Sequence, residues 1–145
     1  ADVIVFEYLE MQGKISGNKK QKLHLWRKRD IQKLCEHQAH RKGIRVSRVS
    51  ARNTSRLACD GSGAVVRNQE NHSLCTFRTG KQYNCDLSAS YNIGARYFIR
   101  ELLKPLPGTG RSSLEAKVPA VKRRTSCVYA DLRKLYVEVN NLKAA

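Results

Sequence analysis

The chain has 145 residues, enough for one domain or for a domain with a tail. Lys and Arg number 28 against 12 Asp and Glu, which gives a formal net charge of +16. Such an excess is too large for a neutral housekeeping surface and predicts a polyanionic partner, with nucleic acid as the default. No run of eighteen apolar residues occurs and no signal-peptide pattern opens the chain, so we expect neither a membrane span nor export. Five cysteines without paired spacing predict free thiols in a reducing cytoplasm.

The chain opens with a predicted strand. Residues 3–6, VIVF, form a short apolar run rich in β-branched residues, typical of a strand buried on both faces of a sheet. Glu7 follows directly, and a carboxylate at the end of a buried strand is costly unless it is solvated, paired or bound to a metal. Taken alone, this position favours a strand that has simply reached the surface.

Residues 19–42 predict a long helix. Its expected inner face is formed by apolar residues at helical spacing: Leu23, Trp26, Ile31, Leu34, Cys35 and Ala39. Gly43 then stands where helices commonly end, and residues 44–49, IRVSRV, predict a second strand. A strand, a helix and a strand in this order form a crossover unit, whose two strands should be parallel.

Positive charge is concentrated in the same region. Residues 14–56 hold fourteen Lys and Arg against two acids, Asp30 and Glu36. A charge run is usually a solvated helix face, but this imbalance is too one-sided for paired surface charges. We therefore predict a phosphate-contacting surface that contains Lys19, Lys20, Lys22, Arg27, Lys28, Arg29, Lys33, Arg41, Lys42 and Arg56.

The middle of the chain changes character twice. Residues 51–83 are dense in Gly, Ser, Asn and Thr, with short apolar pieces and turn dipeptides, and they predict a small β-hairpin subdomain. Residues 84–103 then predict a helix with an apolar stripe, formed by Leu87, Tyr91, Gly94, Phe98 and Leu102. Asp86 precedes this stripe and suits an N-cap, because its carboxylate can accept from free N–H groups of the first turn. Whether Asp86 is only a cap or also a ligand stays open at this point.

The last quarter of the chain carries two further signals. Prolines and glycines between residues 105 and 110 predict a linker. The spacing of Leu132, Leu135, Tyr136 and Val139 predicts one amphipathic helix near the end.

The order of these pieces is more specific than any one of them. It runs from an apolar strand ending in Glu7, through a basic helix and a strand, to TSR at 54–56, a hairpin insertion and NCDLSASYNIGAR at 84–96. Over roughly residues 3–103 this resembles the C-terminal half of the TnpB/OrfB family, transposon-encoded relatives of the type V CRISPR effector nucleases. The resemblance implies an α/β fold: a partial RNase H-like (RuvC-like) domain with a small ribbon-like β-hairpin insertion and a C-terminal helical tail. The implied domains are the strand–helix–strand part (1–53), the insertion (54–85), the final RuvC-like helix (86–104), and a linker with a basic tail (105–145).

The resemblance also implies a catalytic site. RuvC-like nucleases hold two divalent ions with carboxylates from several elements, and Mg²⁺ suits such oxygen ligands. By position, Glu7 resembles the strand-end Glu of the family and Asp86 its final Asp, so both are implied as catalytic residues and metal ligands. The first Asp of the family lies on an upstream strand, and Asp2 stands on the wrong element to replace it. We therefore expect an incomplete magnesium site and no DNA cleavage by the isolated chain.

Many members of the family carry a zinc ribbon with two CxxC pairs in the insertion. Here Cys59 is followed three residues later by Ser62, and Cys75 with Thr79 has neither the spacing nor the residues of a second pair. Cys85 is displaced from the ribbon positions. We expect a ribbon-like hairpin pair that has lost its zinc.

Three functions are compared on this basis. The first is the nucleic-acid-binding C-terminal part of an RNA-guided, transposase-associated DNA endonuclease, with DNA and guide RNA as partners in the bacterial cytoplasm near the nucleoid. The second is a non-catalytic remnant or domesticated fragment that binds nucleic acid. The third, a ribosomal or chromatin-like protein, accounts for the charge but not for Glu7 and Asp86 together. An exposed N-terminal strand would also favour self-association.

Overall fold

The computed structural model describes residues 1–8 and 19–144, with side chains for residues 1–8 and 30–144. Two compact units divide the chain, residues 1–49 and residues 50–145. Each unit is described by itself. Together they contain four α-helices and two small sheets among the described residues, so the predicted mixed α/β composition is confirmed.

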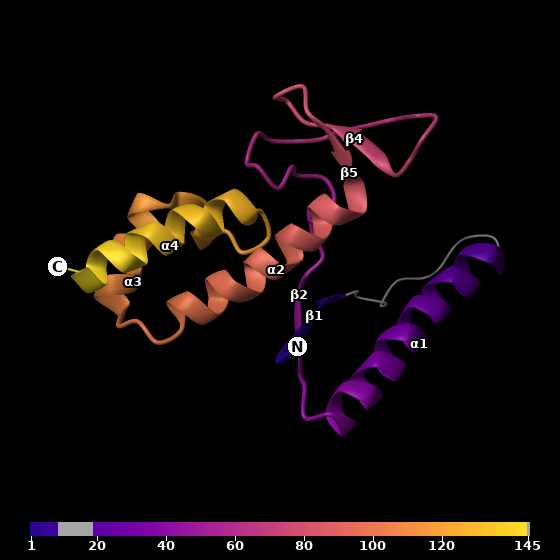
Figure 1. Cartoon of the computed structure of the whole chain (residues 1–145), viewed down its shortest axis with the longest axis horizontal. Helices are drawn as coiled ribbons and strands as arrows, with labels where there is room; N and C mark the ends of the chain where they lie inside the picture. The colour runs from indigo at the N-terminus through magenta and orange to yellow at the C-terminus, as the bar shows by residue number, and fades with distance from the viewer. Residues whose placement is uncertain (9–18, 145) are drawn as a thin grey trace. The chain divides into compact units, whose positions relative to one another are not determined.

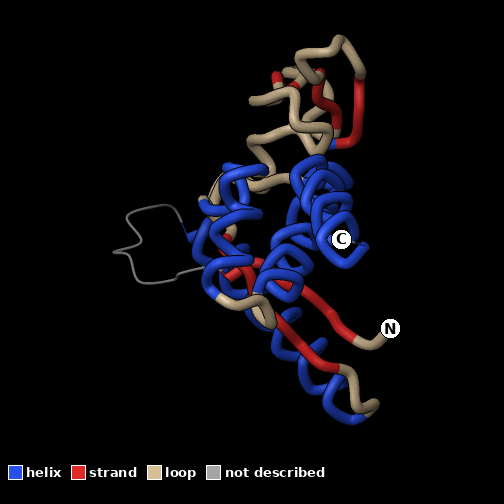
Figure 2. Tube along the Cα trace, turned by 90° about the vertical axis from the view of Figure 1, so that its left-hand side faces the viewer, coloured by secondary structure: helices blue, strands red, loops and turns tan. Residues whose placement is uncertain are grey.

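The first unit is the predicted strand–helix–strand segment. It consists of β1 (Val3–Tyr8), α1 (Lys19–Arg41) and β2 (Arg45–Ser50), and the two strands pair in one sheet. The Arg45 amide donates to the Asp2 carbonyl oxygen at 3.1 Å, which joins the starts of both strands. The strands therefore run parallel, as a crossover connection requires, and Figure 2 shows them side by side.

The inner face predicted for α1 is only partly correct. Ala39 is buried, but Ile31 and Leu34 are 59% and 68% exposed. The side chains of Leu23 and Trp26 lie outside the described residues. The apolar spacing therefore located the helix correctly and its buried face incorrectly, because the two-stranded sheet gives this unit little surface on which a helix can pack.

The second unit begins with the predicted hairpin subdomain, here called the finger (residues 54–85). A three-stranded antiparallel sheet is formed by β3 (Val66–Arg67), β4 (Leu74–Thr76) and β5 (Gln82–Asn84). Its small core contains Ala58, Cys75, Phe77 and Cys85, with Tyr83 packed beside Phe77 at 5.6 Å between ring centroids. Burial, and then the neighbouring Cys85 thiol, raises the pKa of Cys75 to about 11.

The finger leads directly into α2 (Cys85–Leu103), and the last helix of the second unit packs on α2 (Figure 1). Residues 105–145, expected to be a linker and tail, contain α3 (Gly108–Lys117), a 3₁₀ turn η1 (Pro119–Lys122) and α4 (Tyr129–Ala144). The amphipathic helix predicted near the end is α4. An apolar core joins these elements through Ile99, Leu103, Leu114, Val118, Val121, Cys127, Leu135 and Val139.

The buried face of α2 differs from the predicted stripe. Leu87, Tyr91 and Phe98 are 45%, 41% and 52% exposed, whereas Asn92 and Arg96 are almost fully buried. On this buried face, Ser88 and Asn92 are hydrogen-bonded to the first residues of the finger, and Asn92 is also bonded to the start of the last helix. None of the helices in the described part of the chain combines the length and apolarity that a bilayer crossing requires.

Candidate functional site

Asp86 lies in the first turn of α2, and its side chain is exposed. The cap of this helix is Asn84, whose Oδ1 accepts from the amides of Asp86 at 3.0 Å and Leu87 at 2.9 Å. The expectation that Asp86 is the N-cap is therefore wrong. Asn is as good a cap as Asp, and it stands one residue before the helix begins. As a result, the Asp86 carboxylate is not needed for the cap hydrogen bonds, and it remains available to a ligand.

This division of roles makes a stability prediction. Asn84→Ala removes the acceptor of two first-turn amides and should lower the free energy of unfolding by about 1 kcal/mol. Asp86→Asn keeps the shape and removes only the charge near the helix N-terminus, at a cost of about 0.3 kcal/mol. Urea denaturation of the two variants measures the difference. A larger loss in Asp86→Asn than in Asn84→Ala would contradict the assignment of the cap.

Glu7 is the second implied ligand, and it lies at the penultimate position of β1. Its side chain is half-buried, and its backbone oxygen accepts from Gln32 Nε2 of α1 at 3.4 Å. The strand end predicted for Glu7 is thus correct to within one residue. Glu7 belongs to the first unit and Asp86 to the second, so their pairing across a sheet stays a prediction.

The predicted basic surface is described only in part. Lys33, Arg41, Lys42 and Arg56 are exposed. The other six residues lie on the first half of α1, where the backbone is helical but the side chains are outside the described residues: Lys19, Lys20, Lys22, Arg27, Lys28 and Arg29. Other cations are paired with carboxylates, such as Arg111 with Glu115 at 3.0 Å and Lys117 with Glu138 at 2.7 Å. The exposed cations at the end of α1 therefore lie in a different environment from Arg111 and Lys117, whose charges are held in ion pairs.

Two polar residues that the sequence analysis did not select hold the second unit together. Asn92 Nδ2 donates to the carbonyl oxygens of Thr54 and Leu57 at 2.9 and 2.8 Å, while its Oδ1 accepts from the Tyr129 amide at 3.1 Å. Arg96 donates to four carbonyl oxygens, those of Ser50, Arg52, Thr125 and Cys127 at 2.6 to 3.2 Å. Their spacing of four residues on one helix face was the available signal. Together they link residues 50–57 to residues 125–129, at and just before the start of α4.

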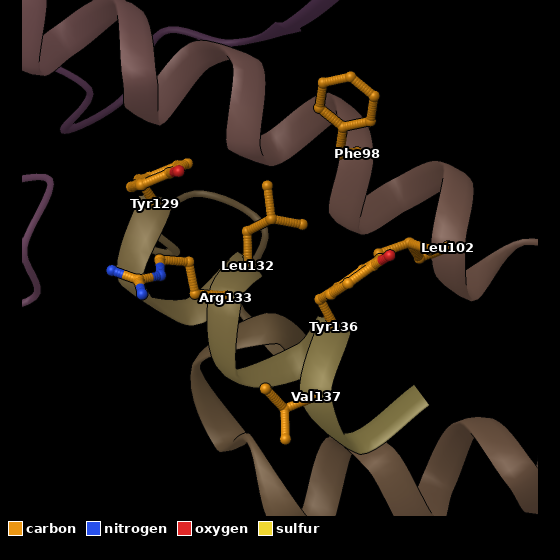
Figure 3. Close-up of a pocket in the computed structure, with 7 residues that line it drawn as sticks. All are labelled: Phe98, Leu102, Tyr129, Leu132, Arg133, Tyr136 and Val137. Carbon is orange, nitrogen blue, oxygen red and sulfur yellow. The ribbon is translucent and has the colours of Figure 1, made fainter. Parts of the chain in front are cut away.

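An apolar groove lies on the exposed side of α2 and α4. It has a volume of about 480 Å³ and is lined by Phe98, Leu102, Tyr129, Leu132, Arg133, Tyr136 and Val137. Figure 3 shows Leu132 and Tyr136 projecting from α4 between Phe98, Leu102 and Tyr129. Phe98 and Leu102, the C-terminal end of the stripe predicted on α2, form one wall of this groove.

Metal ligands are sparse in the described residues. No group of three or more His, Cys, Asp or Glu side chains there is close enough to hold a metal ion. Asp86 and Glu7 are both oxygen donors of the kind that Mg²⁺ prefers.

A comparison with protein families gives one match. Residues 29–93 match the family model described as Cas12f1-like, TNB domain. This segment belongs to the TnpB- and Cas12-related family. The TnpB-like segment begins in α1, includes β2 and the whole finger, and ends in the first half of α2.

The TnpB-like segment contains Asp86 and the described basic residues Lys33, Arg41, Lys42 and Arg56, whereas Glu7 lies before it. The family resemblance inferred from the order of motifs is thus confirmed at this level. No curated protein and no solved structure matches the chain.

Proposed function

We propose that the chain is the nucleic-acid-binding C-terminal part of an RNA-guided DNA endonuclease related to TnpB and Cas12. The observation that carries this proposal is the family match over residues 29–93, which includes the exposed basic end of α1 and the helix that begins beside Asp86. The net charge of +16 supports a polyanionic partner. In this proposal the partners are a guide RNA and a DNA target, and the chain acts near the bacterial nucleoid.

The first unit would be part of a RuvC-like domain, with the parallel strands β1 and β2 belonging to a larger sheet. Glu7 at the end of β1 and Asp86 at the start of α2 would provide carboxylates to divalent ions. The exposure of Asp86 and the presence of a separate cap at Asn84 support this role. Bound Mg²⁺ supplies activation of a water and stabilisation of the leaving oxygen of a phosphodiester.

Binding to nucleic acid tests the first part of the proposal. If Arg41 and Lys42 contact phosphates, replacing both by Gln should reduce the slope of log affinity against log salt by roughly 1.4, because each contact to a single strand contributes about 0.7 to that slope. The matched control is Arg111→Gln with Lys117→Gln, which also removes two positive charges but from cations paired with Glu115 and Glu138. Fluorescence anisotropy with labelled single-stranded DNA and RNA over a salt series gives both slopes.

The expected result is a reduced slope in the first pair and a slope close to that of the unmodified chain in the control pair. Equal changes in both pairs would show that total charge decides affinity and that the end of α1 is no specific surface. No measurable binding by the unmodified chain at low salt would contradict the proposal.

A further inference from the structure

The finger contains two turns with matching spacing. In the first turn Cys59 is followed after two residues by Ser62, and in the second Cys75 is followed after two residues by Arg78. The first turn is closed by a hydrogen bond from the Ala58 amide to the Gly63 carbonyl oxygen at 2.8 Å. The second lies at the end of β4, where the Gly80 amide donates to the Phe77 oxygen at 2.9 Å. Two pairs of ligands three residues apart on turns are the arrangement of a four-ligand structural zinc site.

The structure brings these two turns together. A Cβ atom placed on Gly63 would lie 3.2 Å from Nε of Arg78 and 3.3 Å from its Cδ and Cζ, so the Arg78 side chain packs over the first turn. Thr79 Oγ1 also lies 3.4 Å from Oδ2 of Asp60, as a hydrogen-bond donor. Arg78 is therefore in the position that a fourth ligand on the second turn would occupy. The pairing of Cys75 with Thr79, considered from the sequence, was one residue too long.

The residues in these places do not fit a metal ion. A guanidinium keeps its positive charge and has no lone pair to donate. The Ser62 hydroxyl is buried and has no hydrogen-bond partner, and a serine is not among the usual ligands of zinc. Cys59 and Cys75 alone provide two thiols in the C-x-x pattern, and no group of three suitable side chains exists in the described residues.

Hydrogen bonds and packing contacts with α2 and α4 hold the first turn in place, as a metal ion would in a zinc ribbon. The Cys59 amide donates to Ser88 Oγ of α2 at 3.1 Å, and the Cys59 carbonyl oxygen accepts from the Ala130 amide of α4 at 2.9 Å. Gly61, at φ +82°, has the Cβ of Ala130 only 3.1 Å from where its own Cβ would be, so α4 lies directly against the turn. Within the finger, the buried side chains of Cys75, Phe77 and Cys85 form the centre.

We infer that the finger is a zinc-free ribbon in which Ser62 and Arg78 take the places of two metal ligands, while α2, α4 and a small thiol–aromatic core hold the turns. This inference does not depend on the proposed function. It concerns the folding of residues 54–85 and has its own readout.

The first test uses the full chain purified with and without added zinc. Elemental analysis should find no stoichiometric zinc, and an excess of chelator should leave the melting temperature unchanged, because no binding free energy of a metal contributes to folding. One tightly held zinc per chain, or a melting temperature lowered by the chelator, would overturn the inference.

The second test restores the missing ligands. The double variant Ser62→Cys, Arg78→Cys provides four thiols in two C-x-x-C pairs, and it should gain one zinc per chain and a melting temperature that falls with chelator. The matched control is Ser62→Cys, Thr79→Cys, which has the same number of thiols with the last displaced by one residue, and it should retain no stoichiometric zinc after dialysis. Cobalt absorption in the visible range reports tetrahedral thiolate ligation in either variant.

Three outcomes of the second test contradict the placement of Arg78. They are a folded Ser62→Cys, Arg78→Cys variant that takes up no zinc, equal zinc binding by the control, and a double variant that stays unfolded with and without zinc. A double variant that folds only with zinc would support the inference, since the ion would then provide what the Arg78 and Ser62 contacts provide in the natural sequence.

Discussion

Replacing Arg96 by Leu should lower the free energy of unfolding by about 3 kcal/mol or more, the largest stability effect that we expect from a single substitution in this chain. The residue Arg96 is 4% exposed, and its guanidinium donates to four backbone carbonyl oxygens. Each carbonyl left without a partner in the interior costs roughly 1 kcal/mol or more. Because single domains are stable by only about 5–15 kcal/mol, much of the total would be lost.

Urea denaturation followed by circular dichroism measures this loss, with Arg123→Leu as the control, since Arg123 is exposed on the loop before α4. Arg96→Lys should recover little of the stability, because one ammonium group cannot reproduce the planar fork of a guanidinium. A loss below about 1 kcal/mol in Arg96→Leu would show that water satisfies the four carbonyl groups and that the Arg96 hydrogen bonds contribute little to stability.

The largest effect on activity concerns Glu7 and Asp86. We expect no DNA cleavage by the isolated chain, since Glu7 and Asp86 are only part of the carboxylate set that the resemblance to the TnpB/OrfB family implies. When the N-terminal part of a TnpB relative is added in trans with its guide RNA, we expect Mg²⁺-dependent cleavage. Glu7→Gln or Asp86→Asn should then reduce the cleavage rate by roughly 100-fold or more, because even residues that only support a metal ligand typically contribute 10- to 100-fold.

The control for both variants is Glu70→Gln, which removes one carboxylate from an exposed loop of the finger. Cleavage that is equally fast in all variants would show that Glu7 and Asp86 are not ligands. Absence of cleavage in every combination, with nucleic-acid binding intact, would instead favour a binding remnant without chemistry. Robust metal-dependent cutting by the isolated chain would contradict the expectation of an incomplete site.

The sequence predicted where the helices and strands lie better than it predicted which of their faces are buried. The apolar runs located β1, α1, β2 and α2, and the order of the motifs identified the family. The buried face was predicted wrongly on α1, where the sheet is small and leaves Ile31 and Leu34 exposed, and on α2, where polar residues are buried. On α2, Asn92 and Arg96 point inward because backbone carbonyl groups of two distant segments need donors, a requirement that hydrophobic spacing does not show.

The residues around Asp86 and in the turns of the finger were likewise predicted only in part. The position of Asp86 near a helix start followed from local pattern, but the choice of Asn84 as the cap depends on where the first turn begins, which sequence defines only to within one or two residues. Likewise, the correspondence between Cys59–Ser62 and Cys75–Arg78 depends on the packing of Arg78 against Gly63. Contacts between distant turns are set by tertiary packing, and neither turn alone indicates its partner.

The four carbonyl partners of Arg96 also determine when this unit can fold during synthesis. Two of them, on Ser50 and Arg52, are made before the helix that carries the guanidinium, while those on Thr125 and Cys127 are made well after it. When the growing chain has emerged only as far as α2, the Arg96 guanidinium therefore has only two of its four carbonyl partners. At that stage the finger also lacks the hydrogen bond from the Ala130 amide to the Cys59 carbonyl oxygen. We expect residues 50–104 to remain sensitive to proteases until α4 has left the ribosome, so the last helix completes the folding of the segment that precedes it.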